Sequence, residues 1–214
     1  MARLNGADFV ALFRAIAQMI EREKDHLSAL DGVIGDGDHG VTMSIGFQAV
    51  DKALADQGPD RTPADICMLA AKTFLNAVGA SVGPLYATAL MRAGAAVKGK
   101  SDVGAEDVAD IIAAMADGIV HRGKAEPGQK TMVDAWHPAA EAALGAKAGG
   151  SLKDITAAAA DASRAGAEAT ASLVAGKGRS ANLGDRAVGH IDPGAASAAM
   201  ILDTIAQWAS ERAD

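Results

Sequence analysis

The chain has 214 residues and a formal net charge of −7; half of its residues are hydrophobic, but only 3% are aromatic. This length allows one domain with a sizeable core, and the alanine-rich composition favours closely packed helices over a sheet. The acidic balance, without a basic stripe, argues against nucleic-acid binding.

No segment has the features of a signal peptide or a membrane span. The N-terminus carries too many charges for a signal peptide, and no apolar stretch reaches the roughly 18 residues that a spanning helix needs. Cys67 is the only cysteine, so no disulfide can form within the chain and a reducing compartment is compatible. We therefore expect a soluble, cytoplasmic protein with no membrane partner.

Apolar residues at three- and four-residue steps, separated by short glycine-rich breaks, predict eight helices. No sustained alternation of apolar and polar residues indicates a strand. The expected helices run from about Gly6 to Leu30, from His39 to before Gly58, from Thr62-Pro63 onward, from Pro84 to Val97, around Val108–Ile119, from Thr131 to Lys147, from Ser151 through Val174, and from Pro193 to Ala209.

Two of these helices have clear start signals. Thr62 is placed as an N-cap with Pro63 at the first helical position, and Ser151 with Asp154 resembles a capping box. No linker or fixed repeat divides the chain. The predicted fold is therefore all-α, a barrel or bundle of eight antiparallel amphipathic helices formed by residues 1–214 as a single domain, with a ligand site in the loops at one end.

The most informative loop is DGVIGDGDHG, residues 31–40, in which Asp31, Asp36 and Asp38 are interleaved with glycines just before a helix. A helix N-cap would account for Asp38 but not for all three carboxylates. Glycines allow a tight turn that brings acidic side chains together, and converging carboxylates favour a hard cation such as Mg²⁺ or Ca²⁺. An EF-hand is disfavoured, since its twelfth position, Thr42, is not glutamate. We predict a metal site formed by the three aspartates.

The helix that follows this loop favours an anion at its N-terminus. The backbone N–H groups of His39, Gly40, Val41 and Thr42 form its first turn, and the Thr42 hydroxyl adds a donor. The His39 side chain could also donate to a phosphate. By itself, however, such a histidine is more often packed or capping.

Two further loops have small or cationic residues. In the first, Gly79–Pro84, the sequence GASVGP lets backbone N–H groups approach a phosphate, although an ordinary turn explains it equally well. The second, residues 122–132, carries Arg122, Lys124 and Lys130, which either reach phosphates or are simply solvated. Met132 at its end packs either in the core or beside a base.

The segment from Gly176 to Gly194 is long for a simple connection, and long loops in compact domains are usually functional. Its Arg179 is suited to pair with phosphate and to neutralise transferring charge. Asp192 with Pro193 is sufficiently explained as the start of the last helix. No P-loop motif, serine elbow, HExxH or paired CxxC is present.

In order and spacing these motifs resemble the DhaL family, the nucleotide-binding subunit or domain of dihydroxyacetone kinases, over essentially the whole chain. The resemblance is carried by four motifs: IGDGDHG (34–40), GASVGPLY (79–86), RGKAEPGQKTMVDAW (122–136) and GRSANLGDRAVGHIDPG (178–194).

The resemblance implies a kinase that uses Mg²⁺, expected as two ions, and ADP or ATP. It also implies roles for individual residues. Asp31, Asp36 and Asp38 would hold the metal between the phosphates, and Arg179 would assist transfer. The nucleotide would be lined by His39, Gly40, Val41, Thr42, Ala80, Ser81, Gly123, Met132, Arg179, Asp192, Pro193 and Gly194.

A DhaK-type ketose-binding subunit is implied as partner, because the family's ketose-binding part cannot fit in this chain. The residues do not distinguish a resident ADP, rephosphorylated by a phosphotransferase-system protein, from ATP that exchanges. The ketose acceptor is set by the partner, and a homodimer is left open. The alternative function is a nucleotide-dependent regulatory module that reports to another protein.

Overall fold

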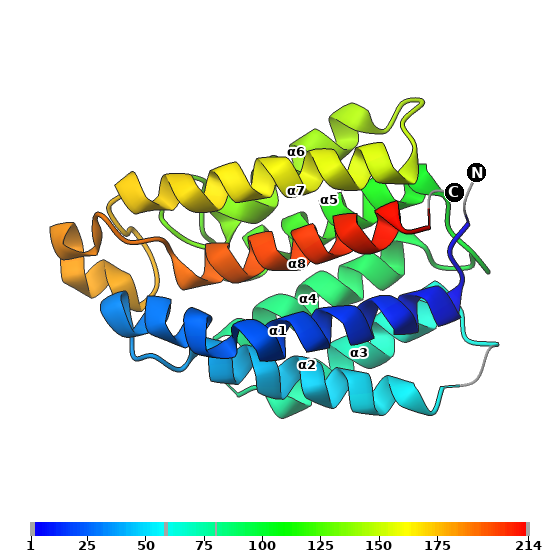
Figure 1. Ribbon diagram of the computed structural model, residues 1–214, viewed down its shortest axis with the longest axis horizontal. Coiled ribbons are helices and arrows are strands. Elements are labelled where there is room, and N and C mark those ends of the chain that lie inside the picture. The colour runs from blue at the N-terminus through cyan, green and yellow to red at the C-terminus, as the bar shows by residue number, and fades with distance from the viewer. Residues whose placement is uncertain (1–2, 58–59, 80, 213–214) are drawn as a thin grey trace.

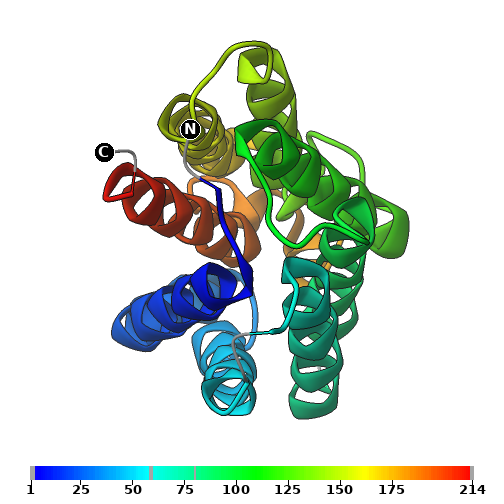
Figure 2. The same cartoon turned by 90° about the vertical axis from the view of Figure 1, so that its right-hand side faces the viewer.

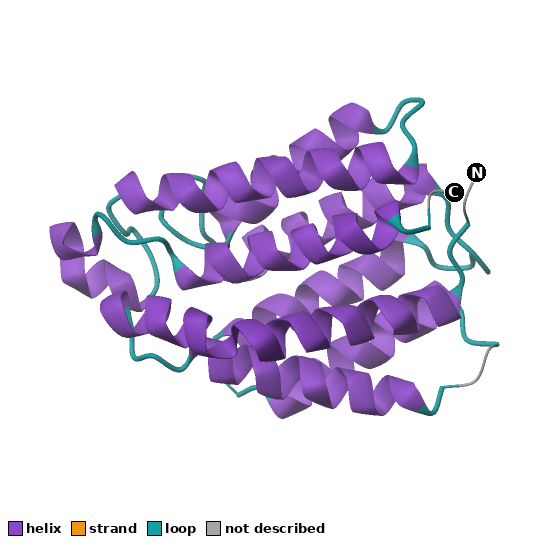
Figure 3. Ribbon diagram, in the orientation of Figure 1, coloured by secondary structure: helices purple, strands orange, loops and turns teal. Residues whose placement is uncertain are grey.

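The computed structural model describes residues 3–57, 60–79 and 81–212, apart from the side chain of Arg179. Over these residues the chain is helical, and its one β-type contact is an isolated bridge between Leu4 and Val103 (Figure 3). The α-helices are α1 (Gly6–Ile34), α2 (His39–Ala55), α3 (Pro63–Ala77), α4 (Val82–Ala96), α5 (Ala105–Gly123), α6 (Val133–Ala146), α7 (Leu152–Ala169) and α8 (Pro193–Ser210). Two 3₁₀ helices, η1 (Thr170–Ser172) and η2 (Arg179–Ala187), lie between α7 and α8.

The helices form a closed ring. Each α-helix packs against the next in sequence, and α8 packs back onto α1. Viewed along the barrel axis, the helices surround a common interior (Figure 2). The loop after α1 and the start of α8 lie at the left-hand end in Figure 1, whereas both ends of the chain lie at the other. The predicted all-α antiparallel barrel is confirmed.

Capping residues set several helix starts. Thr62 and Asp65 form a reciprocal capping box at the start of α3, and Ser151 and Asp154 form another at the start of α7. In each box the cap hydroxyl accepts from a backbone N–H that has no partner within the helix, and the aspartate accepts from the cap N–H. Both predicted starts are confirmed.

Some predicted boundaries were wrong by a few residues, and one shift concerns the site. Helix α1 continues past Leu30 to Ile34, so Asp31 belongs to a helix and not to the loop. The N–H of Gly35 donates to the carbonyl oxygen of Asp31 (2.6 Å), which closes the final turn. Helix α4 begins at Val82, before Pro84, because proline is tolerated in a first turn.

Aromatic residues fill the middle of the ring. Phe47, Phe74, Tyr86 and Trp136 form one buried cluster, with ring centroids of neighbouring members 5.1–6.4 Å apart. Around this cluster the wall is built largely from buried alanines, which lets helices approach closely. Four of the seven aromatic residues are therefore gathered in one buried cluster.

The cysteine and the absence of an apolar span, both noted in the sequence, can be followed in the fold. Cys67 is buried in α3, and burial raises the pKa of its thiol to about 12, which suppresses thiolate chemistry. In the described part of the chain, no helix combines the length and apolarity needed to cross a bilayer.

Candidate nucleotide and metal site

A pocket of about 490 Å³ opens at the end of the barrel where α1 stops and α2 and α8 start. This volume lies within the range of small-molecule and cofactor sites. Its lining comes from each of the four loops singled out in the sequence. The lining residues are Asp31, Ile34, Gly35, Asp36, Asp38, His39, Thr42, Ser81, Val82, Pro84, Leu85, Ile119, Arg122, Gly123, Ala125, Lys130, Thr131, Met132, Val133, Lys177, Gly178, Ser180, Asp192, Pro193 and Gly194.

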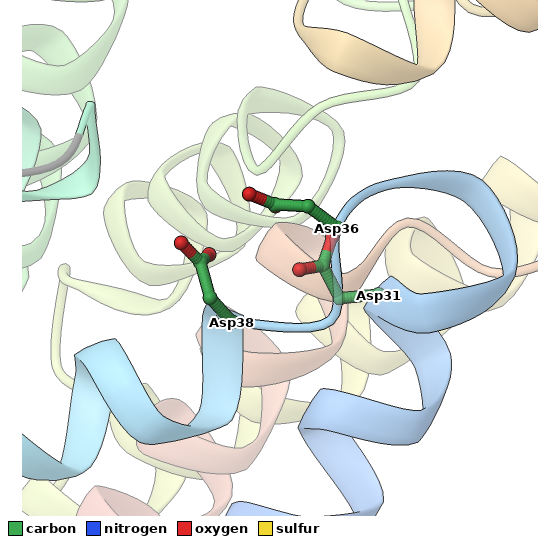
Figure 4. A group of neighbouring side chains, drawn as sticks. All are labelled: Asp31, Asp36 and Asp38. Atoms are coloured by element: carbon green, nitrogen blue, oxygen red, sulfur yellow. The ribbon is translucent and has the colours of Figure 1, made fainter.

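The three predicted metal ligands converge at this pocket. One carboxylate oxygen from each of Asp31, Asp36 and Asp38 lies within 4.8 Å of the other two. Asp31 comes from the last turn of α1, Asp36 from the loop and Asp38 from the residue before α2, and the three side chains point into the same space (Figure 4). Hard oxygen donors at this separation are suited to Mg²⁺ or Ca²⁺.

Asp31 and Asp38 have different local roles. The buried carboxylate of Asp31 accepts from the backbone N–H of His39 (3.1 Å), so it ties the end of α1 to the start of α2. Asp38 occupies the N-cap position of α2, but its side chain makes no capping hydrogen bond. A capping role therefore does not explain Asp38, whose exposed carboxylate is directed to the pocket.

Close helix approach holds this turn in place. Gly37 has a φ of +78°, which an L-residue with a side chain rarely adopts. A Cβ on Gly40 would lie 1.9 Å from the carbonyl oxygen of Lys24 in α1. The first turn of α2 can therefore lie directly on α1, which brings Asp38 near Asp31.

The predicted anion donors at the start of α2 are partly engaged in this structure. The N–H of His39 donates to Asp31, and the N–H of Thr42 donates to the carbonyl oxygen of Asp38 (2.9 Å). Gly40 and Val41 do not line the pocket, although their N–H groups belong to the helix turn that lacks intrahelical partners. The side chain of Thr42 does line it.

The ring of His39 is held by α8. Its Nε2 lies 2.9 Å from the Ser197 hydroxyl, which in turn donates to the carbonyl oxygen of Gly194 (3.0 Å). With its one proton given to Gly194, this hydroxyl accepts from Nε2–H. Burial lowers the pKa of His39, with Asp31 acting in the opposite direction, so the ring is neutral near pH 7 and Nδ1 is an acceptor. A neutral His39 therefore has no second N–H to give to a phosphate.

The second and third loops form the opposite wall. Ser81 lines the pocket, whereas Ala80 lies outside the described residues. Gly123 and Met132 also line it, and Met132 is at the same time buried in the core. The two interpretations of Met132 are therefore compatible.

The cations of the third loop differ in position. Arg122 and Lys130 line the pocket, but Lys124, the C-cap of α5 in a left-handed conformation (φ +50°), does not. Lys130 is fully buried, which the sequence did not predict for a charged loop residue. The residue type also did not indicate its left-handed backbone (φ +58°), because lysine rarely adopts this conformation.

The long fourth segment contains η2 and is therefore less irregular than expected. Lys177, Gly178 and Ser180 line the pocket, and none of the three was predicted. The side chain of Arg179, which was predicted, lies outside the described part. Apolar lining residues such as Leu85 and Ile119 were also missed, because they have the helix periodicity of ordinary core positions.

Asp192, Pro193 and Gly194 all line the pocket at the start of α8. The Asp192 carboxylate accepts from the N–H of Ala195 (2.8 Å), which confirms its predicted capping role. Burial raises the pKa of Asp192 to about 7; the Ala195 N–H and Lys130 act against this rise, whereas Asp134 and Asp31 add to it.

This raised pKa predicts a pH-dependent stability. In the unfolded chain Asp192 titrates near ~3.9. The folded state therefore binds the extra proton, and the free energy of unfolding should fall as the pH rises from about 4 to about 7. Asp192→Asn keeps a capping side chain and removes the ionisation. Denaturant unfolding at pH 5 and pH 8 should show the variant gaining stability relative to the unmodified chain at pH 8; identical pH dependences would contradict the assignment.

Comparison with known proteins identifies the family of this chain. Residues 33–207 match the model of the DAK2 domain. The chain is 40% identical over 205 residues to "PEP-dependent dihydroxyacetone kinase 2, ADP-binding subunit DhaL" of Listeria innocua, with 94% of each chain covered. The chain belongs to the DhaL family. DhaL relatives are kinase subunits, so the predicted enzyme class, a kinase, is confirmed.

Larger relatives contain a DhaL-like part. The L-erythrulose 1-kinase of Mycolicibacterium smegmatis is 34% identical over 204 residues, which is 94% of this chain but 35% of that protein. The crystal structure of the C. freundii dihydroxyacetone kinase in complex with AMP-PNP and Mg²⁺ superposes with a TM-score of 0.73 at 26% identity. It covers 97% of this chain and 35% of that chain, so this DhaL protein corresponds to about a third of these kinases.

Proposed function

We propose that this chain, residues 1–214, is the ADP-binding subunit of a dihydroxyacetone-type kinase and works in the cytoplasm with a separate ketose-binding subunit. The observation that carries the proposal is the convergence of Asp31, Asp36 and Asp38 at the mouth of the 490 Å³ pocket. Asp31 is buried there, and close carboxylates repel one another unless a cation lies between them. The donor set thus fits Mg²⁺, and three carboxylates offer enough oxygens for the two ions that we propose.

When bound, Mg²⁺ would supply positive charge against the phosphates. The protein's own residues complete the site. Arg122 and Lys177 add positive charge around the pocket, which is needed because the protein as a whole is acidic. Ser81 and Thr42 offer hydroxyl donors, and Met132 with neighbouring apolar residues forms a wall suited to a base.

For phosphoryl transfer we assign the catalytic role to Arg179. Its neighbours Gly178 and Ser180 line the pocket, and a guanidinium can pair with two phosphate oxygens at once. Phosphoryl transfer requires little beyond positioning and charge neutralisation, which a single arginine together with a bound metal could supply. His39, kept neutral by its burial and hydrogen-bonded to Ser197, is assigned to shaping the pocket and not to donating a proton.

We further propose that ADP stays bound and is rephosphorylated by a phosphotransferase-system protein. Support comes from the Listeria innocua relative, which matches along 94% of its own length and is named PEP-dependent. The acceptor is a small ketose of the triose or tetrose class, presented by a DhaK-type subunit, since the larger kinases devote about two thirds of their chain to other parts.

The decisive experiment starts with mass spectrometry of the nucleotide released from freshly purified protein. We expect ADP, and Mg²⁺ titration should show whether one or two ions bind. The protein is then combined with a DhaK-type subunit and dihydroxyacetone, with either ATP or a PEP-driven phosphotransferase mixture. Turnover with PEP but not with ATP would support a resident ADP.

The other outcomes are equally informative. Turnover with ATP alone would replace the resident ADP by an exchanging nucleotide. Nucleotide binding without turnover under either condition would favour the regulatory module. No Mg²⁺-dependent nucleotide binding at all would overturn the proposed function.

A further inference from the structure

Lys130 is the one lysine in the described residues that is fully buried, at 0% exposure. It directly precedes the short turn that leads into α6, and it lines the pocket. Lysine is rarely buried completely, because removing its charge from water is costly. Burial lowers the pKa of Lys130, while Asp192 and Asp134 act to raise it.

The ammonium group of Lys130 joins two distant points of the chain. It donates to the backbone carbonyl oxygen of Thr170, in η1, and to that of His190, just before α8. These two residues flank the segment 173–189, here called the closing loop. The closing loop contains η2 and the pocket-lining residues Lys177, Gly178 and Ser180.

Other hydrogen bonds hold the same stem. The N–H of Gly189 donates to the carbonyl oxygen of Ala171 (2.7 Å), and the N–H of Gly176 donates to that of Gln129, the residue before Lys130 (3.0 Å). The Thr170 hydroxyl also accepts from the N–H of Asp192 (2.9 Å), and Lys130 adds a cation that meets carbonyl oxygens on both sides of the loop. Its backbone has a φ of +58°, a conformation that is costly for a residue other than glycine.

From this geometry we propose that Lys130 is a positioning residue: it clamps both ends of the closing loop so that Lys177–Ser180 stays folded over the phosphate end of the pocket. The inference rests on the proposed function for what occupies the pocket. The clamp itself is independent of the nucleotide. Its buried charge and its backbone conformation are costs that neutral packing between α6 and α8 would not require.

The test compares Lys130→Met, which keeps the length and removes the donors, with Lys130→Gln, which restores an N–H donor group on a shorter side chain. Lys153→Met, at an exposed position on α7, is the matched control. Limited trypsin digestion reports on the closing loop, because Lys177 and Arg186 are exposed tryptic sites within it and proteases cleave a folded segment mainly through its local opening. Calorimetry measures Mg²⁺–ADP affinity on the same samples.

For Lys130→Met we expect retained helical content by circular dichroism and cleavage in the closing loop that is roughly 10-fold faster or more, since two charge-assisted hydrogen bonds are lost. ADP affinity should fall by a similar factor, Lys130→Gln should recover part of both effects, and Lys153→Met should match the unmodified chain. Cleavage is measured without nucleotide, and affinity is measured by titrating Mg²⁺–ADP.

Unchanged loop cleavage and ADP affinity in Lys130→Met would overturn the clamp. So would acceleration spread equally over all tryptic sites, because that pattern indicates general destabilisation. If Lys130→Met is too unstable to purify, the comparison of Lys130→Gln with Lys153→Met decides by the same criteria. Failure of the unmodified chain to bind ADP would overturn the proposed function, while loop cleavage would still report on the clamp.

Discussion

Replacing Asp36 or Asp38 by alanine is expected to weaken Mg²⁺-dependent ADP binding strongly while helical content is retained. Both carboxylates are exposed and lie outside the helices, so the helices should form without them. Each supplies one of three oxygens that lie within 4.8 Å of one another. Losing one of few carboxylate ligands should lower the affinity on the order of 100-fold, as measured by calorimetry with Mg²⁺ and ADP.

The control is Asp25→Ala, which removes an exposed carboxylate from the same α1 helix away from the pocket. It should bind ADP like the unmodified chain. Excess Mg²⁺ should partly restore binding to Asp38→Ala if the lost group is a metal ligand. Unchanged affinity in both Asp36→Ala and Asp38→Ala would remove the metal assignment.

Gly40→Ala is expected to damage both the fold and the site. The added Cβ would lie 1.9 Å from the carbonyl oxygen of Lys24 and 2.8 Å from the Ser28 hydroxyl, and the carbonyl belongs to a rigid helix backbone. The start of α2 must therefore move away from α1, which separates Asp38 from Asp31. We expect a loss of about 1–3 kcal/mol or more in unfolding free energy, together with weaker Mg²⁺–ADP binding.

Gly145→Ala is the matched control for this change, since no atom lies within 4 Å of the added methyl group and the residue is in α6. Alanine there should stabilise the chain by up to about 1 kcal/mol through its helix propensity. Thermal unfolding and ADP calorimetry on both variants give the comparison. A Gly40→Ala protein as stable as Gly145→Ala, with intact binding, would show that the helix contact tolerates a side chain.

The helices were predictable because their signals are local. Thr62 and Ser151 form the capping boxes expected from residues three positions apart, and the apolar stripe of Val108–Ile119 is buried as a helix face. The acidic cluster was also predictable, since Asp31, Asp36 and Asp38 are close in sequence and separated by glycines. Spacing alone did not show that Asp31 would be helical; this followed from the hydrogen bond that closes the last turn of α1.

Other features of the site depend on contacts between distant residues. The sequence context of His39 suggested a hydrogen-bond donor to phosphate, but its Nε2 is hydrogen-bonded to Ser197, 158 residues away. Lys130 had the appearance of a solvated loop cation, but the carbonyl oxygens of Thr170 and His190 meet it in the interior. Neither partner has a residue type or spacing that could indicate the pairing.

The sequence by itself determined the helices, their order and the acidic loop, because hydrogen bonds and glycine turns within a few residues specify them. Only the tertiary structure decided which polar groups face the pocket and which are hydrogen-bonded to other parts of the chain. The physical reason is that closing the ring of helices brings α1, α6 and α8 together at one end. A donor such as the Lys130 ammonium is then assigned by what it meets there, and not by its neighbours in sequence.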